Sequence, residues 1–233
     1  MLEVRKLGKT GLAVSEIGLS LAGGNVAALA KRAVALGVRL FRVEDGDVDA
    51  VRLAPDVVVL APGGDVCPRT LSEIRASCGD PRTMALCSDP GDLGLALSLA
   101  GGVGGVVVPF NPAEQQCSAL LPRAGRAGLG VIGVSALAGG AFGGRTAKHP
   151  VPAVVQALRP LATPRRSLVQ VAVLFAIANM HLNSVLVHVS SEAHLDEVVG
   201  AVDAEPLSVA DLERIFEIYA HRNDDDPSKG CGR

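Results

Sequence analysis

The chain has 233 residues, 48% of them hydrophobic, and a formal net charge of −2, which is enough apolar material for the core of a globular protein. The 22 basic residues are balanced by 24 acidic ones. We therefore expect no nucleic-acid partner, because a polyphosphate backbone requires a basic surface. Aromatic residues make up only 3%, with no tryptophan and a single tyrosine, Tyr219.

The five cysteines are scattered and form no CxxC pair. This pattern favours free thiols in the cytoplasm over a disulfide framework or a zinc site, and the histidine spacings match no metal motif either. The N-terminus lacks the long apolar segment of a signal peptide. The uncharged run 93–113 is long enough to cross a bilayer, but glycines and prolines interrupt it. We interpret it as helix, turn and buried strand, and expect no membrane partner.

Short runs rich in valine, isoleucine and leucine alternate with helical stretches along the chain. Most runs are apolar on both faces, as parallel strands covered by helices are. The predicted strands are Ile17–Leu21, Arg39–Glu44, Val57–Ala61, Thr83–Cys87, Gly105–Phe110, Gly130–Ser135 and Ser184–Val189. The predicted helices are Val26–Leu36, Leu71–Cys78, Asp92–Ala100, Glu114–Ala127, Ser167–Met180, Glu192–Val202 and one that begins at Ser208.

Repeated strand-then-helix units are compatible with an open doubly wound sheet or with a closed α/β barrel of the (β/α) type. The run 128–133 satisfies G-x-G-x-x-G, the phosphate-binding string of a doubly wound sheet. It leads into a predicted strand and opens no helix, so its amides would not point at a pyrophosphate. The barrel is therefore the predicted architecture, as one domain over residues 1–222 with a polar tail at 223–233.

Several stretches of the chain resemble the aldo-keto reductase family. The start, RKLGKTGLAVSEIGL at residues 5–19, resembles a family segment that forms a hairpin at the bottom of the barrel and continues into the first barrel strand. VPFNP at 108–112, the run 128–140 and the segment Ser167–Glu197 resemble later family motifs. The resemblance extends from residue 3 to about residue 218 and implies a nicotinamide-dependent carbonyl reductase.

The family's catalytic residues do not carry over to this chain. Members use a tyrosine as general acid, tuned by an aspartate and a lysine, and a histidine that orients the carbonyl. Arg42 stands in place of the aspartate and Pro62 in place of the lysine, while the single tyrosine, Tyr219, falls in the last predicted helix. The unit that carries the histidine is missing, so we expect seven barrel strands, with one β/α unit deleted and ordinary carbonyl reduction lost.

The cofactor-binding positions that the resemblance implies are partly altered. Asp89, Val107 and Val134 replace an asparagine, a glutamine and a stacking residue, and His188 and Val198 replace a glycine and an asparagine. We expect no cofactor unless the groove survives, in which case it would take NADP(H). The matching positions are Ser88, Ser135, Leu137, Ser190, Ser191 and Glu197.

Functional side chains of such barrels lie at the C-terminal ends of the strands. There, Arg42 shares strand parity with Glu44, so both face the same way. Arg42 either forms a salt bridge with Glu44 or Asp89 in an inactive site, or binds the carboxylate or phosphate of a ligand. His188 is the only histidine at a predicted strand end and either acts as acid or base or is a partnered, partly buried side chain.

Two further strand-end residues are candidates for catalysis. Cys87 is a candidate nucleophile, although nothing in the sequence lowers its pKa and a buried, inert thiol is the default. Asn111 matches a family motif, and we expect it to support the strand-to-loop turn.

Three functions stay open at this point. The first is a non-redox acid/base enzyme on a small, anionic metabolite, or a binding pseudoenzyme. The second is an NADP(H)-dependent reductase with substitute catalytic groups. The third is an oligomeric scaffold, because removing a strand from a closed barrel leaves two edges that a homodimer would cover.

Overall fold

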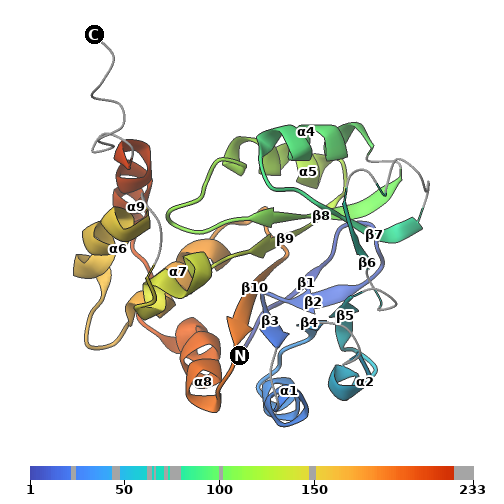
Figure 1. The fold of residues 1–233 in the computed structure, drawn as a ribbon, viewed down its shortest axis with the longest axis horizontal. Helices are drawn as coiled ribbons and strands as arrows, with labels where there is room; N and C mark the ends of the chain where they lie inside the picture. The colour runs from blue at the N-terminus through green and yellow to red at the C-terminus, as the bar shows by residue number, and fades with distance from the viewer. Residues whose placement is uncertain are drawn as a thin grey trace.

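Eight parallel strands in one sheet form the centre of the structure, in the order β5-β4-β3-β10-β9-β8-β7-β6 (Figure 1). The computed structural model describes residues 1–21, 25–43, 48–61, 65, 67–70, 73, 80–99, 102–146 and 151–222. The strands are β3 Ile17–Leu21, β4 Leu40–Val43, β5 Val58–Leu60, β6 Cys67–Arg69, β7 Asp80–Leu86, β8 Val103–Pro109, β9 Gly130–Val134 and β10 Ser184–Val189. The first and last of them in the chain, β3 and β10, pair in parallel, as in a (β/α) barrel.

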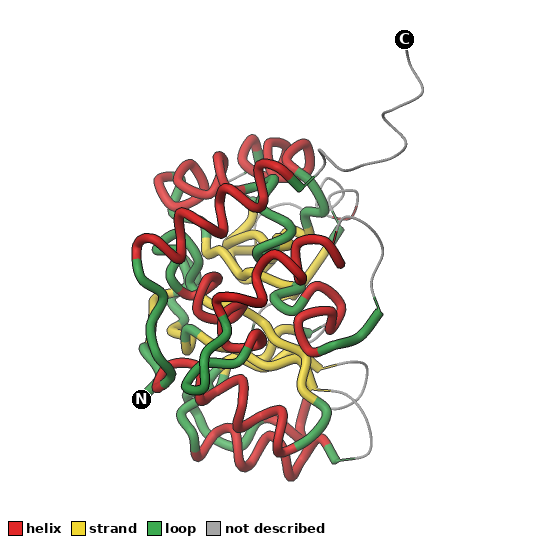
Figure 2. Tube along the Cα trace, turned by 90° about the vertical axis from the view of Figure 1, so that its left-hand side faces the viewer, coloured by secondary structure: helices red, strands yellow, loops and turns green. Residues whose placement is uncertain are grey.

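The helices lie outside the strands (Figure 2). They are α1 Val26–Ala35, α2 Val48–Val51, α4 Pro90–Ser98, α5 Leu121–Arg126, α6 Val151–Leu158, α7 Leu168–Ile177, α8 Glu192–Val199 and α9 Val209–His221. Short 3₁₀ segments cover Ser118–Leu120, Ala138–Gly143, Arg159–Leu161 and Gly200–Asp203. Within the described ranges, no helix is both long and apolar enough to cross a membrane.

Alternate residues of each strand face the inside of the barrel, because successive side chains of a strand point to opposite faces. The inward set forms one apolar cluster of buried side chains, and the outward set packs beneath the helices in a second cluster. The inward cluster consists of Leu7, Val14, Leu40, Val58, Leu60, Met84, Val107, Ile132 and Leu186. The barrel interior is therefore filled by side chains below its C-terminal rim.

An N-terminal hairpin closes the opposite end of the barrel. Its strands, β1 Val4–Lys6 and β2 Ala13–Ser15, pair antiparallel, and Leu7 from the connecting turn is fully buried in the inward cluster. Gly8 has a φ of 52°, and a Cβ at this position would lie 2.1 Å from the backbone nitrogen of Gly130, at the start of β9. Only glycine fits this approach, so the hairpin seals the N-terminal end and leaves the C-terminal end for a ligand.

The predicted (β/α) barrel is confirmed, but the expected count of seven strands is wrong, because the sheet has eight. Sequence reasoning missed β6, since a three-residue strand with Pro68 at its centre shows no apolar run. Only the residues 61–66 separate β5 from β6, fewer than the dozen or more that a helical crossover needs. Consistent with this short link, β5 and β6 do not pair within the described residues.

The open seam between β5 and β6 has a side-chain substitute for the missing pairing. The backbone N–H of Val59, a fully buried residue of β5, donates to Oδ2 of Asp65 at 2.9 Å. Oδ1 of the same carboxylate accepts from Nη1 of Arg52 at 3.1 Å. Asp65 thus satisfies an edge donor that would bond to a neighbouring strand in a closed barrel.

Most other predicted elements are found with shifted ends. Within the run 93–113, residues 93–98 belong to α4 and residues 103–109 form β8, in agreement with the predicted helix and buried strand. The helix predicted over Glu114–Ala127 is shorter, because residues 111–114 form a bridged turn and helical structure starts at Ser118. Glu44, the tail 223–233 and, apart from Glu73, the helix predicted over Leu71–Cys78 lie outside the described residues.

Candidate functional site

Three polar side chains form a row at the C-terminal ends of three neighbouring strands. Ser20 of β3 is in register with Arg42 of β4 on one side and with His188 of β10 on the other. Residues in register on parallel strands project from the same face of the sheet. Leu186, two residues before His188, belongs to the inward cluster. The row is therefore the first polar layer above the apolar filling of the barrel.

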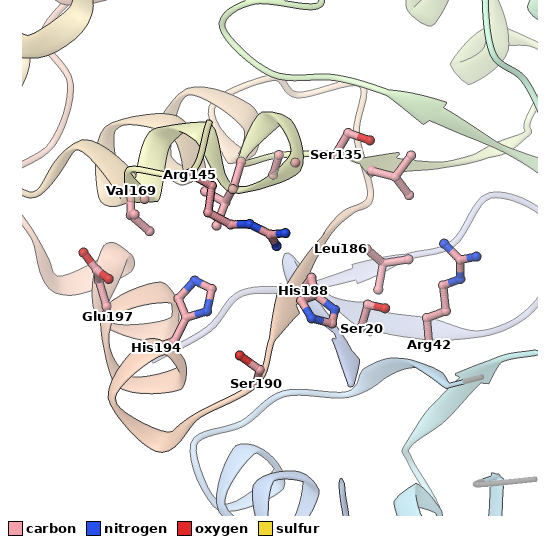
Figure 3. Close-up of a pocket in the computed structure, with 16 residues that line it drawn as sticks. Ser20, Arg42, Ser135, Arg145, Val169, Leu186, His188, Ser190, His194 and Glu197 are labelled. Carbon is pink, nitrogen blue, oxygen red and sulfur yellow. The ribbon is translucent and has the colours of Figure 1, made fainter. Parts of the chain in front are cut away.

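A cavity of ≈ 590 Å³ opens over this row (Figure 3). The remaining walls come from the segment after β9, from α7 and from the first turns of α8. Among the predicted site residues, the cavity brings together Arg42, Ser135, Leu137, His188, Ser190 and Glu197.

The segment after β9 has an unusual backbone that a buried asparagine holds in place. Ser135 adopts a φ of 59°, which is uncommon for a residue with a side chain. Its carbonyl accepts a 2.9 Å hydrogen bond from Nδ2 of Asn111, whose Oδ1 accepts from the N–H of Ala113 at 2.8 Å. Asn111 is fully buried and its Nδ2 also donates to Glu114. The structure thus places Asn111 behind the cavity wall, where it supports the turn.

Arg145 reaches the cavity from the end of this segment. Its N–H donates to the carbonyl of Gly140 at 3.1 Å. Gly140 has a φ of 92°, and a Cβ there would lie 2.5 Å from Cδ of Arg145. The missing side chain of Gly140 therefore provides both the turn and the space in which Arg145 lies.

The first turns of α8 supply His194 and Glu197 to the cavity. Glu197 accepts a 2.6 Å hydrogen bond from Oγ of Ser167. Ser191 does not line the cavity. Its hydroxyl accepts from the N–H of His194 and caps α8. Burial lowers the pKa of His194, while the charge of Glu197 raises it and the neighbouring His188 lowers it.

Positive charge predominates among the described residues that line the cavity. Arg42 and Arg145 line it, and neither forms an ion pair or a side-chain hydrogen bond with any residue that the structure describes. Glu197 is the only carboxylate among the described lining residues. The site therefore presents two guanidinium groups that can donate to an anion.

The predicted site residues that follow β7 lie away from this cavity. Cys87 is buried, its Sγ is 3.6 Å from the carbonyl of Ala85, and burial raises its pKa to about 12. Ser88 is exposed and does not line the cavity. Asp89 caps α4 by accepting from the N–H of Asp92 at 2.9 Å. It forms no ion pair with Arg42 in the described part of the chain.

Sequence reasoning missed Ser20, Arg145 and His194 as lining residues. The register of β3 with β4 and β10 places Ser20 between the predicted candidates Arg42 and His188, so the position of Ser20 on its predicted strand could have identified it. His194 and Arg145 lie several residues beyond the strand ends, so no strand position indicates that they line the cavity. For the described residues, no group of three or more His, Cys, Asp or Glu side chains is arranged to hold a metal ion.

The parallel barrel, with helices outside and a cavity at its C-terminal rim, places this protein in the class of (β/α) barrels. Comparison with family models finds the aldo/keto reductase family over residues 105–220. The chain belongs to this family, as its opening and later motifs predicted.

Solved structures agree on the fold. Aldo-keto reductase AKR11C1 from Bacillus halodurans is similar in its holo form with a TM-score of 0.65 and 13% sequence identity. Its apo form gives a TM-score of 0.65 and 14% identity. Each alignment covers 94% of this chain and 96% of the other, and at such low identity the likeness concerns the fold alone. Comparison with curated proteins finds no match.

Proposed function

We propose that this family member binds a small anionic molecule in the cavity at the barrel rim and has lost nicotinamide-dependent carbonyl reduction. The observation that carries the proposal is the pair of arginines, Arg42 and Arg145, which line the cavity with no anionic partner among the described residues. A guanidinium with no partner in a concave, partly apolar site favours a carboxylate or phosphate as ligand.

The position of the single tyrosine supports the loss of reduction. Tyr219 lies in α9, and its ring stacks beneath the guanidinium of Arg222 with 3.5 Å to the ring centre. It does not line the cavity. Arg42 stands at the position of the family's aspartate, where a positive charge opposes the role of a carboxylate. Without a tyrosine the site lacks the family's proton donor for a carbonyl oxygen.

The two histidines of the cavity provide the chemistry that remains. Burial lowers the pKa of His194, which favours the neutral imidazole, the form that can accept a proton. His188 lies in the row with Ser20 and Arg42, where it can donate to or accept from a bound ligand. A non-redox proton transfer on an anion is the reaction this set supports, and a binding pseudoenzyme is the alternative.

NADP(H) binding is the second candidate function, and it has one specific observation in its favour. Ser135, Leu137, Ser190 and Glu197, which match cofactor positions of the family, line the same cavity. When bound, the cofactor would supply a hydride. The fit is partial, because Ser88 lies outside the cavity and the hydroxyl of Ser191 caps α8.

A titration with NADPH separates the two candidates. The chain has no tryptophan, so the emission of NADPH can be followed with little contribution from the protein. We expect no change in NADPH emission at micromolar concentrations and no consumption of NADPH with a panel of aldehydes and ketones. Inorganic phosphate and short carboxylates should in contrast give a calorimetric binding signal. Micromolar NADPH binding with consumption of the cofactor would overturn the proposal.

The homodimer expected from unpaired strand edges stays a prediction. The bond from Val59 to Asp65 already satisfies one edge donor within the chain, so a dimer would form at the remaining edge of β6. Light scattering at micromolar concentration tests it, and a monomeric mass would contradict it.

A further inference from the structure

The two arginines of the cavity come from separate segments and approach it from different walls. Arg42 lies on β4, and Arg145 follows the glycine-rich turn after β9. In the view of Figure 3, the imidazole of His188 lies between the two guanidinium groups. We propose that the ligand is a dianion with two separate anionic groups, one bound to Arg42 and the other to Arg145, and with its uncharged middle over His188. This inference rests on the proposed anion-binding function.

The surroundings of Arg42 fit one end of such a ligand. Its neighbours in register are Ser20, a hydroxyl donor, and Leu60, a buried apolar residue of β5. The row is solvent-accessible at Arg42 and His188. A carboxylate there can take two parallel N–H bonds from the guanidinium and a third from Ser20, while Leu60 offers no competing acceptor.

The surroundings of Arg145 fit the second end. Its backbone is fixed by the bond to Gly140, so its side chain starts from a defined point of the rim. The carboxylate of Glu197, which also lines the cavity, accepts from Ser167 and interacts with His194. Arg145 forms no ion pair with Glu197 or with any other described residue. It is therefore available to a ligand group.

The wall between the two arginines is less polar than its ends. Leu186 and Val134 line the cavity beside His188, and both belong to or pack against the apolar filling of the barrel. Methylene groups of a ligand would contact these side chains, and the imidazole of His188 would lie next to the carbon chain. Because the two arginines come from separate walls of the cavity, a ligand with an anionic group at each end can pair with both of them.

Isothermal titration calorimetry with straight-chain dicarboxylates tests the inference. The probes are succinate, glutarate and adipate, each compared at equal ionic strength with the monocarboxylate of the same length and with inorganic phosphate. We expect one dicarboxylate length to bind the native chain about 10- to 100-fold more tightly than its monocarboxylate, since each end adds a charge-assisted hydrogen-bonded contact.

Variants assign the two ends. Arg42→Gln and Arg145→Gln should each reduce the affinity for the preferred dicarboxylate to about that of the monocarboxylate. Arg42→Lys should recover part of the loss, because lysine keeps the charge but not the two-pronged contact. Arg159→Gln is the matched control, since Arg159 is exposed and does not line the cavity, and it should bind like the native chain. Circular dichroism confirms that each variant is folded.

The outcomes separate this inference from the proposed function. If monocarboxylate or phosphate binds as tightly as every dicarboxylate, or if one arginine can be removed without effect, the two-ended ligand is refuted and anion binding stands. If no anion binds the native chain, both are refuted. The length series on the native chain decides the matter even where a variant does not fold.

Discussion

Substitution of Asp65 tests whether a side chain stabilises the open seam between β5 and β6. Its carboxylate accepts from the fully buried N–H of Val59 at 2.9 Å and pairs with Arg52 at 3.1 Å. Asp65→Ala removes the acceptor and leaves that N–H without a partner at the open edge of β5. We therefore expect Asp65→Ala to lower the free energy of unfolding.

The structure sets the size of the effect. A hydrogen bond to a charged acceptor contributes about 1.5–3 kcal/mol. The ion pair adds up to about 1 kcal/mol, because Arg52 is 44% exposed and solvent screens its charge. We expect a loss of about 2–4 kcal/mol for Asp65→Ala. Asp65→Asn, which keeps an oxygen acceptor but loses the charge, should cost about 1 kcal/mol, and Arg52→Gln no more than that.

Urea unfolding followed by far-ultraviolet circular dichroism measures these differences, with a second probe to check two-state behaviour. Glu213→Ala is the control, because Glu213 is an exposed carboxylate of α9 and should change stability by less than about 0.5 kcal/mol. If Asp65→Ala unfolds at the same urea concentration as Glu213→Ala, then Asp65 does not stabilise the seam and the reasoning is refuted.

Three further predictions concern the site and its neighbours. Asn111→Ala should destabilise the chain by about 2–4 kcal/mol in the same urea assay, because the buried N–H of Ala113 and the carbonyl of Ser135 lose their partners; an unchanged midpoint would show that the turn holds without it. Burial lowers the pKa of His194, so the unfolded chain binds more protons than the folded one just below pH 6.5, the ordinary value for histidine. Stability should therefore rise with pH through that window and level off above it, and His194→Gln should flatten the rise relative to the native chain; equal slopes would contradict the assigned shift. Burial raises the pKa of Cys87 to about 12 and also raises that of Cys117, so peptide mapping should find neither alkylated by iodoacetamide in the folded chain and both alkylated in urea. Rapid labelling of folded Cys87 would show that its thiol is accessible and reactive.

The cavity and the core of the barrel occupy separate layers of the structure. The apolar filling and the hairpin lie below the rim, so they do not depend on the polar side chains that line the cavity. Arg42 lies at the rim, where its side chain meets solvent and its backbone is already fixed by the strand pairing. Exchange of rim residues can thus alter the ligand without disturbing the core.

Much of the fold was predictable because local patterns encode it. The apolar runs gave β3 and β10 with their observed ends, Ile17–Leu21 and Ser184–Val189, since buried parallel strands are apolar on both faces. The eighth strand, β6, was not predictable, because it has only three residues, with a proline at its centre, and among the described strands it pairs only with β7.

The candidate site was predictable in part for a related reason. Arg42, His188 and Ser190 lie at strand ends, and strand ends of a barrel converge on one rim. The sequence could not show that Cys87 and Asp89 lie outside the cavity on the same rim, because that depends on which strands the cavity covers.

By itself, the sequence determined the family, the barrel and the absence of a tyrosine anywhere but in the last helix, because motifs and composition are local properties of the chain. The tertiary structure alone decided that Arg145 and His194 share a cavity with Arg42, since these residues are brought together by the β9 turn, α8 and β4, which are distant in sequence. It also decided how the edge of β5 is satisfied, because the bond from Val59 to Asp65 forms where β5 and β6 do not pair within the described residues.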